Sequence, residues 1–516
     1  MLVNQFLSES IGRYPDKEAL ICPERRYSYR EIGEKVKEFS SLLLDMKVNK
    51  SDRVIIFLEN SFESVVSIFG ILNVGGVFVV INPQIKSQKL EFIINDSGTK
   101  ILITDMNHLE QIKDVLGKCA CLEKVIVTDI EVREIIAVDN RSINVIPFNN
   151  TGILSERINN ISKIVDVDLA SIIYTSGSTG FPKGVMLSHR NMISATDSII
   201  EYLGNTCDDI VFNVLPLSFD YGLYQVLMVF RFGGTVVLEK SFVFPHHVLK
   251  RIMEEKATGF PIVPTIANIL LRLKDLKKYE ISSLRYITNT AQKLPKKTIF
   301  GLMTAFPDVQ IFSMYGLTEC KRVSYLPPEK LKFKPDSVGQ TMPNTEAFIV
   351  DGKGNRITKA GIVGELVVRG SNVMVGYWNK PEETQKVIKP GGYPSDRWLY
   401  TGDYFKMDED KDLYFCGRKD DIIKTSGEKV SPKEIENILY ELDEVQEAAV
   451  IGVPDNTLGQ AIKAVVSLKN NSKLTEKNII QHCSKCLEKF MVPKYVEIRS
   501  QLPKTVTGKI SKKDLS

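Results

Sequence analysis

The chain has 516 residues, 43% of them hydrophobic and 25% charged, and its formal net charge is +4. A chain of this length and composition is expected to form two or more globular domains, and its interleaved charges give no argument for nucleic-acid binding. The eight cysteines show no disulfide spacing and no secretory signal is evident, so the sequence predicts a cytoplasmic protein.

The first expected elements lie between residues 52 and 104, where short β-branched runs alternate with helix-like segments. The pattern returns from 169 to 264, with a strand expected at 209–218, a helix at 221–232, and a turn and strand at 233–239. This alternation predicts layered α/β subdomains. The apolar run from Val65 to Pro83 contains serine, asparagine and glycine. We therefore expect a buried helix, a glycine turn and a buried strand there, and no membrane span.

A glycine-rich loop, YTSGSTGFPKG, occupies residues 174–184. It is not a Walker motif, because Lys183 follows a proline and precedes a glycine. Glycines nevertheless let backbone N–H groups turn toward an anion, hydroxyls add donors, and lysine neutralises charge. Taken alone, the loop is compatible with a phosphate-binding loop or with a flexible surface turn.

Further polar segments follow the loop in chain order. MYGLTE offers Tyr315 as an aromatic platform, Thr318 as a hydroxyl, and Glu319 as an oxygen ligand suited to Mg²⁺. In YTGDYF a carboxylate, Asp403, comes just after a glycine and could take both hydroxyls of a ribose. GRKDDIIKTSGEKV begins with Gly417 and Arg418, and LPKTVTGKI carries a lysine after a Thr-Gly turn.

These polar residues also have purely structural explanations. Asp403 could cap a turn, Arg418 could pair with Asp420 on the surface, and Lys509 could be a solvated lysine. The order of the segments along one chain is harder to explain in this way.

The last third of the chain predicts two smaller units. Residues 344–357 and 364–370 look like strands with glycine turns, which indicates a small β subdomain. A final unit begins near Gly417 and contains a helix with Ser431 as N-cap, Pro432 at its first position and Glu434 completing a capping box. Its expected apolar face is Ile435, Ile438, Leu439 and Leu442. Strands at 448–453 and 462–468 and a second helix follow, so residues 418–516 predict a small α+β domain after a large domain of residues 1–417.

A possible metal motif lies in this unit, where Cys483 and Cys486 follow His482. Cys483 shares helical spacing with Ile479 and Leu487, so we expect it to pack in the core rather than bind zinc.

Taken in order, the polar segments resemble those of the adenylate-forming superfamily, which includes acyl-CoA synthetases, adenylation domains of nonribosomal peptide synthesis and firefly-type luciferases. The resemblance covers essentially the whole chain. It implies a large N-terminal domain and a small, mobile C-terminal lid. It also implies that a carboxylate reacts with ATP to give an acyl-adenylate and pyrophosphate. The acyl group then passes to the phosphopantetheine thiol of CoA or a carrier protein, and AMP is released.

The resemblance also assigns roles to residues. Those expected to bind ATP or AMP are Thr175, Ser176, Gly177, Ser178, Thr179, Gly180, Lys183, Thr290, Ala291, Gln292, Tyr315, Gly316, Asp403 and Arg418. Those expected to act in the chemistry are Thr318, Glu319 (as the Mg²⁺ ligand), Lys424 and Lys509, and Asp420 is expected to be the hinge of the lid. A lysine such as Lys509, touching both the substrate carboxylate and the α-phosphate, would favour the charge that develops in the transition state.

The segment LPLSFDYGLY bears on the identity of the carboxylate. Many acyl-CoA synthetases have an aromatic–histidine pair near Phe219 and Asp220, whereas amino-acid adenylation domains have Phe-Asp, and there the aspartate binds the substrate ammonium. A buried carboxylate is costly unless it is paired, which favours a cationic substrate. The alternative is that Asp220 caps a helix beginning at Tyr221.

We therefore expect a small apolar substrate site lined by Tyr221, Tyr224 and Met314. The favoured substrate is proline or a similar amino acid, which would be loaded onto a separate carrier protein. The alternatives are a fatty or aryl acid ligase that uses CoA or an acyl carrier protein, and a nucleotide-binding protein without catalysis. The second alternative predicts loss of the chemistry-specific residues, which are all present.

Overall fold

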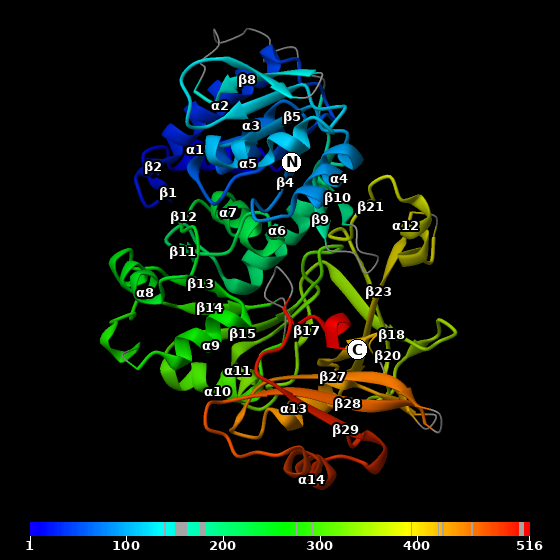
Figure 1. Ribbon diagram of the computed structural model, residues 1–516. Coiled ribbons are helices and arrows are strands. Elements are labelled where there is room, and N and C mark those ends of the chain that lie inside the picture. Colours follow the sequence, from blue (N-terminus) through cyan, green and yellow to red (C-terminus); the bar gives the residue numbers. More distant parts are fainter. Residues whose placement is uncertain are drawn as a thin grey trace.

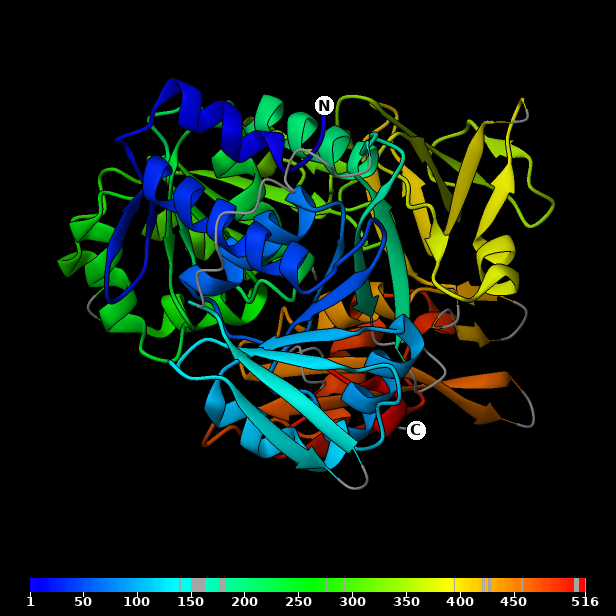
Figure 2. The same ribbon diagram turned by 90° about the horizontal axis from the view of Figure 1, so that it is seen from above.

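A computed structural model describes residues 1–138, 141–149, 163–175, 182–274, 276–290, 293–393, 395–419, 421, 423–425, 428–455, 458–504 and 510–515. Figure 1 shows a large N-terminal part, with the C-terminal segment in orange and red at one end of the molecule. Seen from above, the yellow strands of a third sheet stand to one side of the blue and green subdomains (Figure 2).

Two nine-stranded sheets form the body of the N-terminal part. The strands of the first sheet, in spatial order, are β17 (Gln340–Thr341), β16 (Ser324–Leu326), β15 (Gln310–Tyr315), β14 (Tyr286–Asn289), β13 (Gly259–Ile262), β11 (Ile210–Asn213), β12 (Thr235–Leu238), β1 (Glu18–Ile21) and β2 (Arg26–Ser28). Those of the second are β21 (Gly376–Tyr377), β10 (Lys183–Ser188), β9 (Leu169–Thr175), β4 (Val77–Val80), β3 (Arg53–Ile56), β5 (Ile101–Thr104), β6 (Lys124–Val127), β8 (Arg141–Pro147) and β7 (Glu134–Val138). The central strands, such as β13 to β15 and β3 to β6, run parallel and are largely buried, which explains their continuous apolar runs. Nearer the edges, β10 and β16 pair antiparallel with both neighbours.

Helices connect and cover these strands. They are α1 (Gln5–Arg13), α2 (Tyr29–Asp45), α3 (Phe62–Asn73), α4 (Ser87–Ser97), α5 (Met106–Leu116), α6 (His189–Leu203), α7 (Asp220–Phe232), α8 (Pro245–Glu254), α9 (Pro264–Arg272), α10 (Lys296–Ala305), α11 (Pro328–Leu331) and α12 (Pro381–Val387). The predicted layered α/β fold is confirmed. The apolar run 65–83 forms buried α3, a turn at Gly75 with φ of 78°, and buried β4. No helix in the described part of the chain is long and apolar enough to cross a membrane.

A third sheet confirms the predicted small β subdomain. It contains β19 (Arg356–Ile357), β18 (Thr345–Val350), β20 (Gly364–Gly370), β23 (Arg397–Met407) and β22 (Ile388–Pro390), with β24 (Leu413–Arg418) also paired to β23. Arg418 thus belongs to this sheet, and the chain enters the next sheet only at Ile423. The predicted boundary at 417/418 falls inside β24.

The C-terminal unit has its own sheet and core. Its strands are β26 (Glu428–Val430), β25 (Ile423–Thr425), β28 (Gly459–Leu468), β27 (Val445–Asp455) and β29 (Tyr495–Arg499), and its helices are α13 (Pro432–Leu439) and α14 (Glu476–Cys486). Ile435 and Leu439 are buried in its core, with Ile438 and Leu442 packed against them as predicted. Cys483 is fully buried in the same core, which confirms its predicted place there.

The capping box predicted for α13 is wrong. Ser431 does occupy the N-cap position, but its side chain accepts no hydrogen bond from the helix. Its hydroxyl donates instead to the carbonyl of Cys416 in β24, while the Glu434 carboxylate accepts from Lys406 Nζ at 2.9 Å. Contacts with the third sheet therefore replace the local cap.

Candidate active site

The carboxyl ends of β11, β14 and β15 lie along one edge of the first sheet, because these strands are parallel. β11 is followed by the segment that leads to Asp220, and β14 is followed by Thr290. β15 is followed by Thr318 and Glu319, the TE motif. Ligands of open α/β sheets bind at this edge. The fold thus brings together three segments that are far apart in the sequence.

The glycine loop connects two antiparallel strands of the second sheet. Thr175 at the end of β9 pairs with Lys183 at the start of β10, so both predicted site residues stand at the base of the loop. The loop residues Ser176, Gly177, Ser178, Thr179 and Gly180 lie outside the described residues.

Lys183 and Glu319 flank one tyrosine ring. The Lys183 ammonium lies 5.3 Å from the centroid of the Tyr377 ring and 2.9 Å from a carboxylate oxygen of Glu383 in α12. The Tyr377 hydroxyl donates to Glu319 Oε1 at 2.8 Å. Burial, together with the charge of Glu319, raises the pKa of Tyr377, which keeps the phenol protonated as a donor. The predicted phosphate-binding lysine and the predicted Mg²⁺ ligand are therefore neighbours.

Asp403, Arg418 and Tyr315 form a second group. Strands β23 and β24 place Asp403 opposite Arg418, with 3.0 Å between Asp403 Oδ1 and a guanidinium nitrogen. The Tyr315 hydroxyl donates to Asp403 Oδ2 at 2.6 Å. Asp403 is buried, and this burial raises the pKa of its carboxyl, while Arg418 and Tyr315 oppose the rise. Asp403 is thus held by two predicted site residues, and Arg418 has a buried carboxylate as its partner.

Asp403 Oδ1 is close to Arg418 but has no hydrogen-bond partner of suitable geometry among the described residues. A buried acceptor without a donor is costly. Paired ribose hydroxyls would supply donors at this position, in agreement with the role expected from the sequence.

The remaining nucleotide residues are only partly described. The Tyr315 ring packs edge-on against Phe405 at 4.7 Å and faces Phe415 at 6.3 Å, so aromatic rings surround the predicted adenine platform. Thr290 is buried, whereas Ala291 and Gln292 lie outside the described residues. Asp420 and Lys509 also lie outside the described residues. Lys424 lies in β25, but its side chain is not described.

The helix-cap interpretation of Asp220 is wrong. Helix α7 begins at Asp220 itself, Phe219 occupies the N-cap position, and no side chain caps the helix there. The Asp220 carboxylate instead lies 3.6 Å from the ammonium of Lys321, which also donates to the Asp220 carbonyl at 2.8 Å. A cation of the chain therefore already pairs with Asp220.

Lys321 and Arg322 are site residues that the sequence analysis missed. Lys321 is buried, and burial lowers its pKa to about 7. Its ammonium lies 4.4 Å from the Tyr224 ring centroid, and the Arg322 guanidinium lies 5.4 Å from that of Tyr221. The one available signal was a dibasic pair separated from the TE motif by Cys320. We call Asp220, Tyr221, Tyr224, Lys321 and Arg322 the α7 cluster.

The predicted substrate residues at the start of α7 lie together, and their surroundings are not simply apolar. Tyr221 and Tyr224 are buried, and the Tyr221 hydroxyl donates to the carbonyl of Thr288 at 2.8 Å. Phe219 packs edge-on against Tyr221 at 6.1 Å. Met314 is buried and accepts a hydrogen bond from Tyr202. Two cations lie among these side chains, contrary to the expected apolar site.

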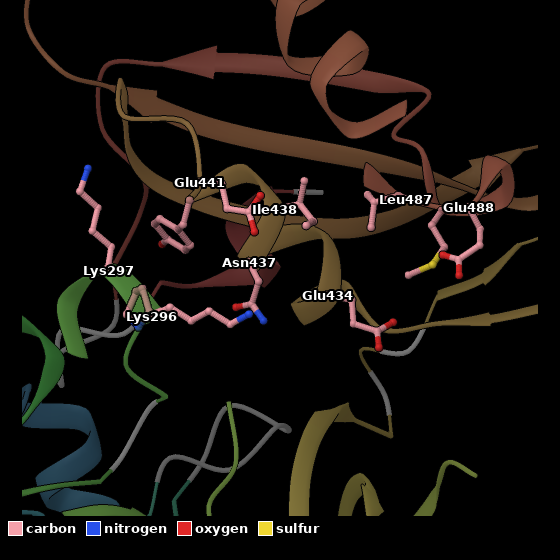
Figure 3. Close-up of a pocket in the computed structure, with 11 residues that line it drawn as sticks. Lys296, Lys297, Glu434, Asn437, Ile438, Glu441, Leu487 and Glu488 are labelled. Carbon is pink, nitrogen blue, oxygen red and sulfur yellow. The ribbon is translucent and has the colours of Figure 1, made fainter. Parts of the chain in front are cut away.

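A cavity of about 470 Å³ separates the N-terminal part from the C-terminal unit. Figure 3 shows Lys296 reaching toward Asn437 of the C-terminal unit, whose Glu434 and Glu441 also line the cavity. None of the predicted site residues that the structure describes lines it. It is a cleft between the two parts of the chain.

Comparison with known proteins agrees with this architecture. The family model for AMP-binding enzymes matches residues 7–378, and that for the C-terminal domain of AMP-binding enzymes matches residues 434–509. The long-chain-fatty-acid–CoA ligase of Bacillus subtilis (strain 168) is 31% identical, over 99% of this chain and 94% of that protein.

Two solved structures have similar folds. ATP-bound MatB from Rhodopseudomonas palustris has a TM-score of 0.86 and 26% identity, covering 100% of this chain and 98% of that one. The anthranilate CoA ligase AuaEII in complex with anthranoyl-AMP has a TM-score of 0.86 and 27% identity, covering 100% and 96%. The chain therefore belongs to the AMP-binding enzyme family, the adenylate-forming ligases.

Proposed function

We propose that the protein is an AMP-forming acid–CoA ligase, which activates a carboxylic acid as its adenylate and transfers the acyl group to CoA. The observation that carries this choice is the pairing of Asp220 with Lys321. In the amino-acid hypothesis, the substrate ammonium is the partner of Asp220. In the structure, Lys321 of the chain itself is that partner. The names of the similar proteins, which include two CoA ligases, support the same choice.

In the first step, a carboxylate oxygen attacks the α-phosphorus of ATP and pyrophosphate leaves. The chain mainly has to align the reactants and neutralise charge. Lys183 and the glycine loop would hold the leaving phosphates, Asp403 and Arg418 the ribose, and Thr318 the α-phosphate. Lys509 would contact both reacting groups.

A magnesium ion fits the donor set at Glu319. Mg²⁺ is commonly held by one or two carboxylates together with substrate phosphates. Tyr377 donates to Glu319 Oε1 and thereby fixes the orientation of the carboxylate. When bound, the ion would neutralise phosphate charge.

In the second step, the C-terminal unit would rotate about Asp420, Lys509 would leave the site, and the surface near Lys424 would approach the thiol. Rotation about one hinge lets a single active site perform two reactions in turn.

The amino-acid hypothesis remains the second candidate, because Phe219 and Asp220 match its motif. It requires the substrate ammonium to displace Lys321 from the Asp220 carboxylate.

A thioester assay tests this function. We expect AMP and an acyl-CoA, identified by mass, when the protein is given ATP, Mg²⁺, CoA and a panel of fatty, aryl and dicarboxylic acids. Lys183→Ala should reduce the yield, whereas Arg190→Gln, in an exposed ion pair, should not. Thioester formation only with an amino acid and a phosphopantetheinylated carrier protein would contradict the proposal.

A further inference from the structure

Arg322 is a buried arginine without a counter-ion. Its side chain is 2% exposed, among the largest fully buried side chains of the molecule. Among the described residues, its Nε and Nη1 atoms have no hydrogen-bond partner and no carboxylate forms an ion pair with it, although the side chain also interacts with Tyr202. A buried, unpaired charge carries a large desolvation cost.

Other arginines with a small or intermediate exposed fraction have hydrogen-bond acceptors. Arg251 lies against the buried carboxylate of Glu239, and Arg285 lies 2.8 Å from that of Asp209. Arg53 donates to backbone carbonyls. The Nε and Nη1 atoms of Arg322 have neither kind of acceptor among the described residues.

The position of Arg322 links it to the acid that is activated. It lies three residues after Glu319, and its guanidinium faces Tyr221 of the α7 cluster. Burial raises the pKa of Tyr202 to about 12, and the nearby Arg322 charge opposes this rise. The Tyr202 hydroxyl in turn contacts Met314, so Arg322 stands among the residues expected to line the acid site.

The backbone fixes this position. A Cβ atom at Gly316 would come within 2.3 Å of the Lys321 carbonyl oxygen and 2.9 Å of the Arg322 Cα. Lys321 itself has φ of 58°, in the left-handed region that non-glycine residues rarely adopt. Strained conformations persist where the surrounding structure demands them, often at ligand sites. The chain thus bends tightly to place two successive cations next to α7.

The charges of the α7 cluster do not balance internally. Asp220 is the one carboxylate among its five residues, and Lys321 is its ion-pair partner. The faces of Tyr221 and Tyr224 stabilise cations weakly. A planar guanidinium pairs best with a carboxylate that accepts two parallel hydrogen bonds.

We propose that the acid activated by this protein is a dicarboxylic acid, whose second carboxylate binds the Arg322 guanidinium. This inference rests on the proposed ligase function and specifies its substrate class. The reacting carboxylate lies at Thr318 and the α-phosphate, and the second one lies beside Tyr221. An apolar acyl chain in the same place would leave Nε and Nη1 of Arg322 without an acceptor.

Matched pairs of acids test the proposal. Acid-dependent ATP–pyrophosphate exchange is measured with butanoate and succinate, pentanoate and glutarate, and benzoate and isophthalate. For at least one pair, we expect the wild-type kcat/KM to be about 100-fold or more higher for the diacid, because a site built for a polar group rejects analogues that lack it. Arg322→Met should remove this preference by lowering kcat/KM for the diacid, and Arg322→Lys should retain part of it. Arg190→Gln, in an exposed ion pair, is the control that should leave the preference unchanged.

Thermal unfolding separates this role from a structural one. Without ligand, Arg322→Met should unfold at the same or a higher temperature, since replacing an unpaired buried charge by an apolar side chain is not costly. The preferred diacid should raise the unfolding temperature of the wild type but not of Arg322→Met. Arg322→Gln, which keeps hydrogen-bond donors without the charge, provides a second variant if Arg322→Met does not fold.

Two outcomes would overturn the proposal, and they can be distinguished. Exchange with monoacids at rates equal to those with diacids would reject the substrate class and leave the ligase function standing. Absence of exchange with every acid, in protein that binds ATP, would reject both.

Discussion

At the scale of single residues, Asp403 gives the sharpest test of the nucleotide site. Its carboxylate is buried, takes a hydrogen bond from Tyr315 on one oxygen and lies against Arg418 on the other. Asp403→Asn should raise the KM for ATP about 10- to 100-fold, because hydrogen bonds to a charged acceptor contribute about 1.5–3 kcal/mol. Titration of ATP in the exchange assay measures this. An unchanged KM would show that Asp403 does not bind the ribose.

Lys183 has a competing partner in Glu383. The Lys183 and Lys386 ammonium groups together lower the pKa of Glu383 to about 2, so this carboxylate is charged at neutral pH. Phosphates binding at Lys183 must compete with it. Glu383→Gln should therefore lower the KM for ATP severalfold, and the effect should shrink at high salt. A higher KM in Glu383→Gln would show that Glu383 orients Lys183 instead of competing for it.

Tyr315, Asp403 and Arg418 come from three separate motifs that the sequence assigned to one nucleotide site. The structure brings their side chains into contact, and their roles stay predictions. Lys321 and Arg322 were missed because a dibasic pair in a sequence usually indicates a solvated surface. Their burial depends on Gly316 and on α7, which is about 100 residues earlier in the chain.

At the scale of elements, the turn after β15 depends on Gly316. Gly316→Ala would place a Cβ 2.3 Å from the Lys321 carbonyl oxygen, so backbone must move. We expect a loss of about 1–3 kcal/mol in the free energy of unfolding and reduced exchange activity. Denaturant unfolding measures the first quantity. Gly352→Ala, which would meet no atom within 4 Å, is the matched control.

Helix α6 begins with a histidine that should make stability depend on pH. His189 is buried, accepts a hydrogen bond from the Val3 N–H at 3.1 Å, and has its pKa lowered by burial to about 4. The unfolded chain, with a histidine pKa of about 6.5, binds more protons between these values. The free energy of unfolding should therefore fall as the pH falls from about 6.5 to about 4, by up to about 1.4 kcal/mol per pH unit from this group.

His189→Gln, which keeps an acceptor for Val3, should flatten this dependence. Equilibrium unfolding of both proteins at several pH values provides the comparison. Parallel pH profiles would assign the acid sensitivity to other groups.

The elements were predicted well where burial was continuous and less well at their ends. The strand expected at 209–218 stops at Asn213, because the Asn213 side chain hydrogen-bonds the backbone of Leu215 and Pro216 follows. The predicted capping box failed because Ser431 and Glu434 find partners in a distant sheet. Such long-range partners are not visible in a local pattern.

At the scale of the whole molecule, two ion pairs of the described residues join the C-terminal unit to the N-terminal part. Lys406 binds Glu434 at 2.9 Å, and Lys297 binds Asp443. If the C-terminal unit rotates between two half-reactions, these pairs must break. The double variant Glu434→Gln/Asp443→Asn should therefore sample more orientations than the wild type.

Spin labels on the exposed Cys121 and Cys486 can report this motion, with Cys207 replaced by serine. We expect the distribution of distances between the labels to broaden in the double variant. The same distribution in both proteins would show that the two pairs do not hold the unit in place.

The proposed ligase activates a carboxylic acid that needs no ammonium group. ATP–pyrophosphate exchange across the twenty amino acids and a panel of fatty, aryl and dicarboxylic acids tests this most directly. We expect exchange with a non-amino acid, and a higher rate for a diacid than for its matched monoacid. Exchange with proline or another amino acid alone, abolished by Asp220→Asn, would contradict it and make Asp220 the ammonium site.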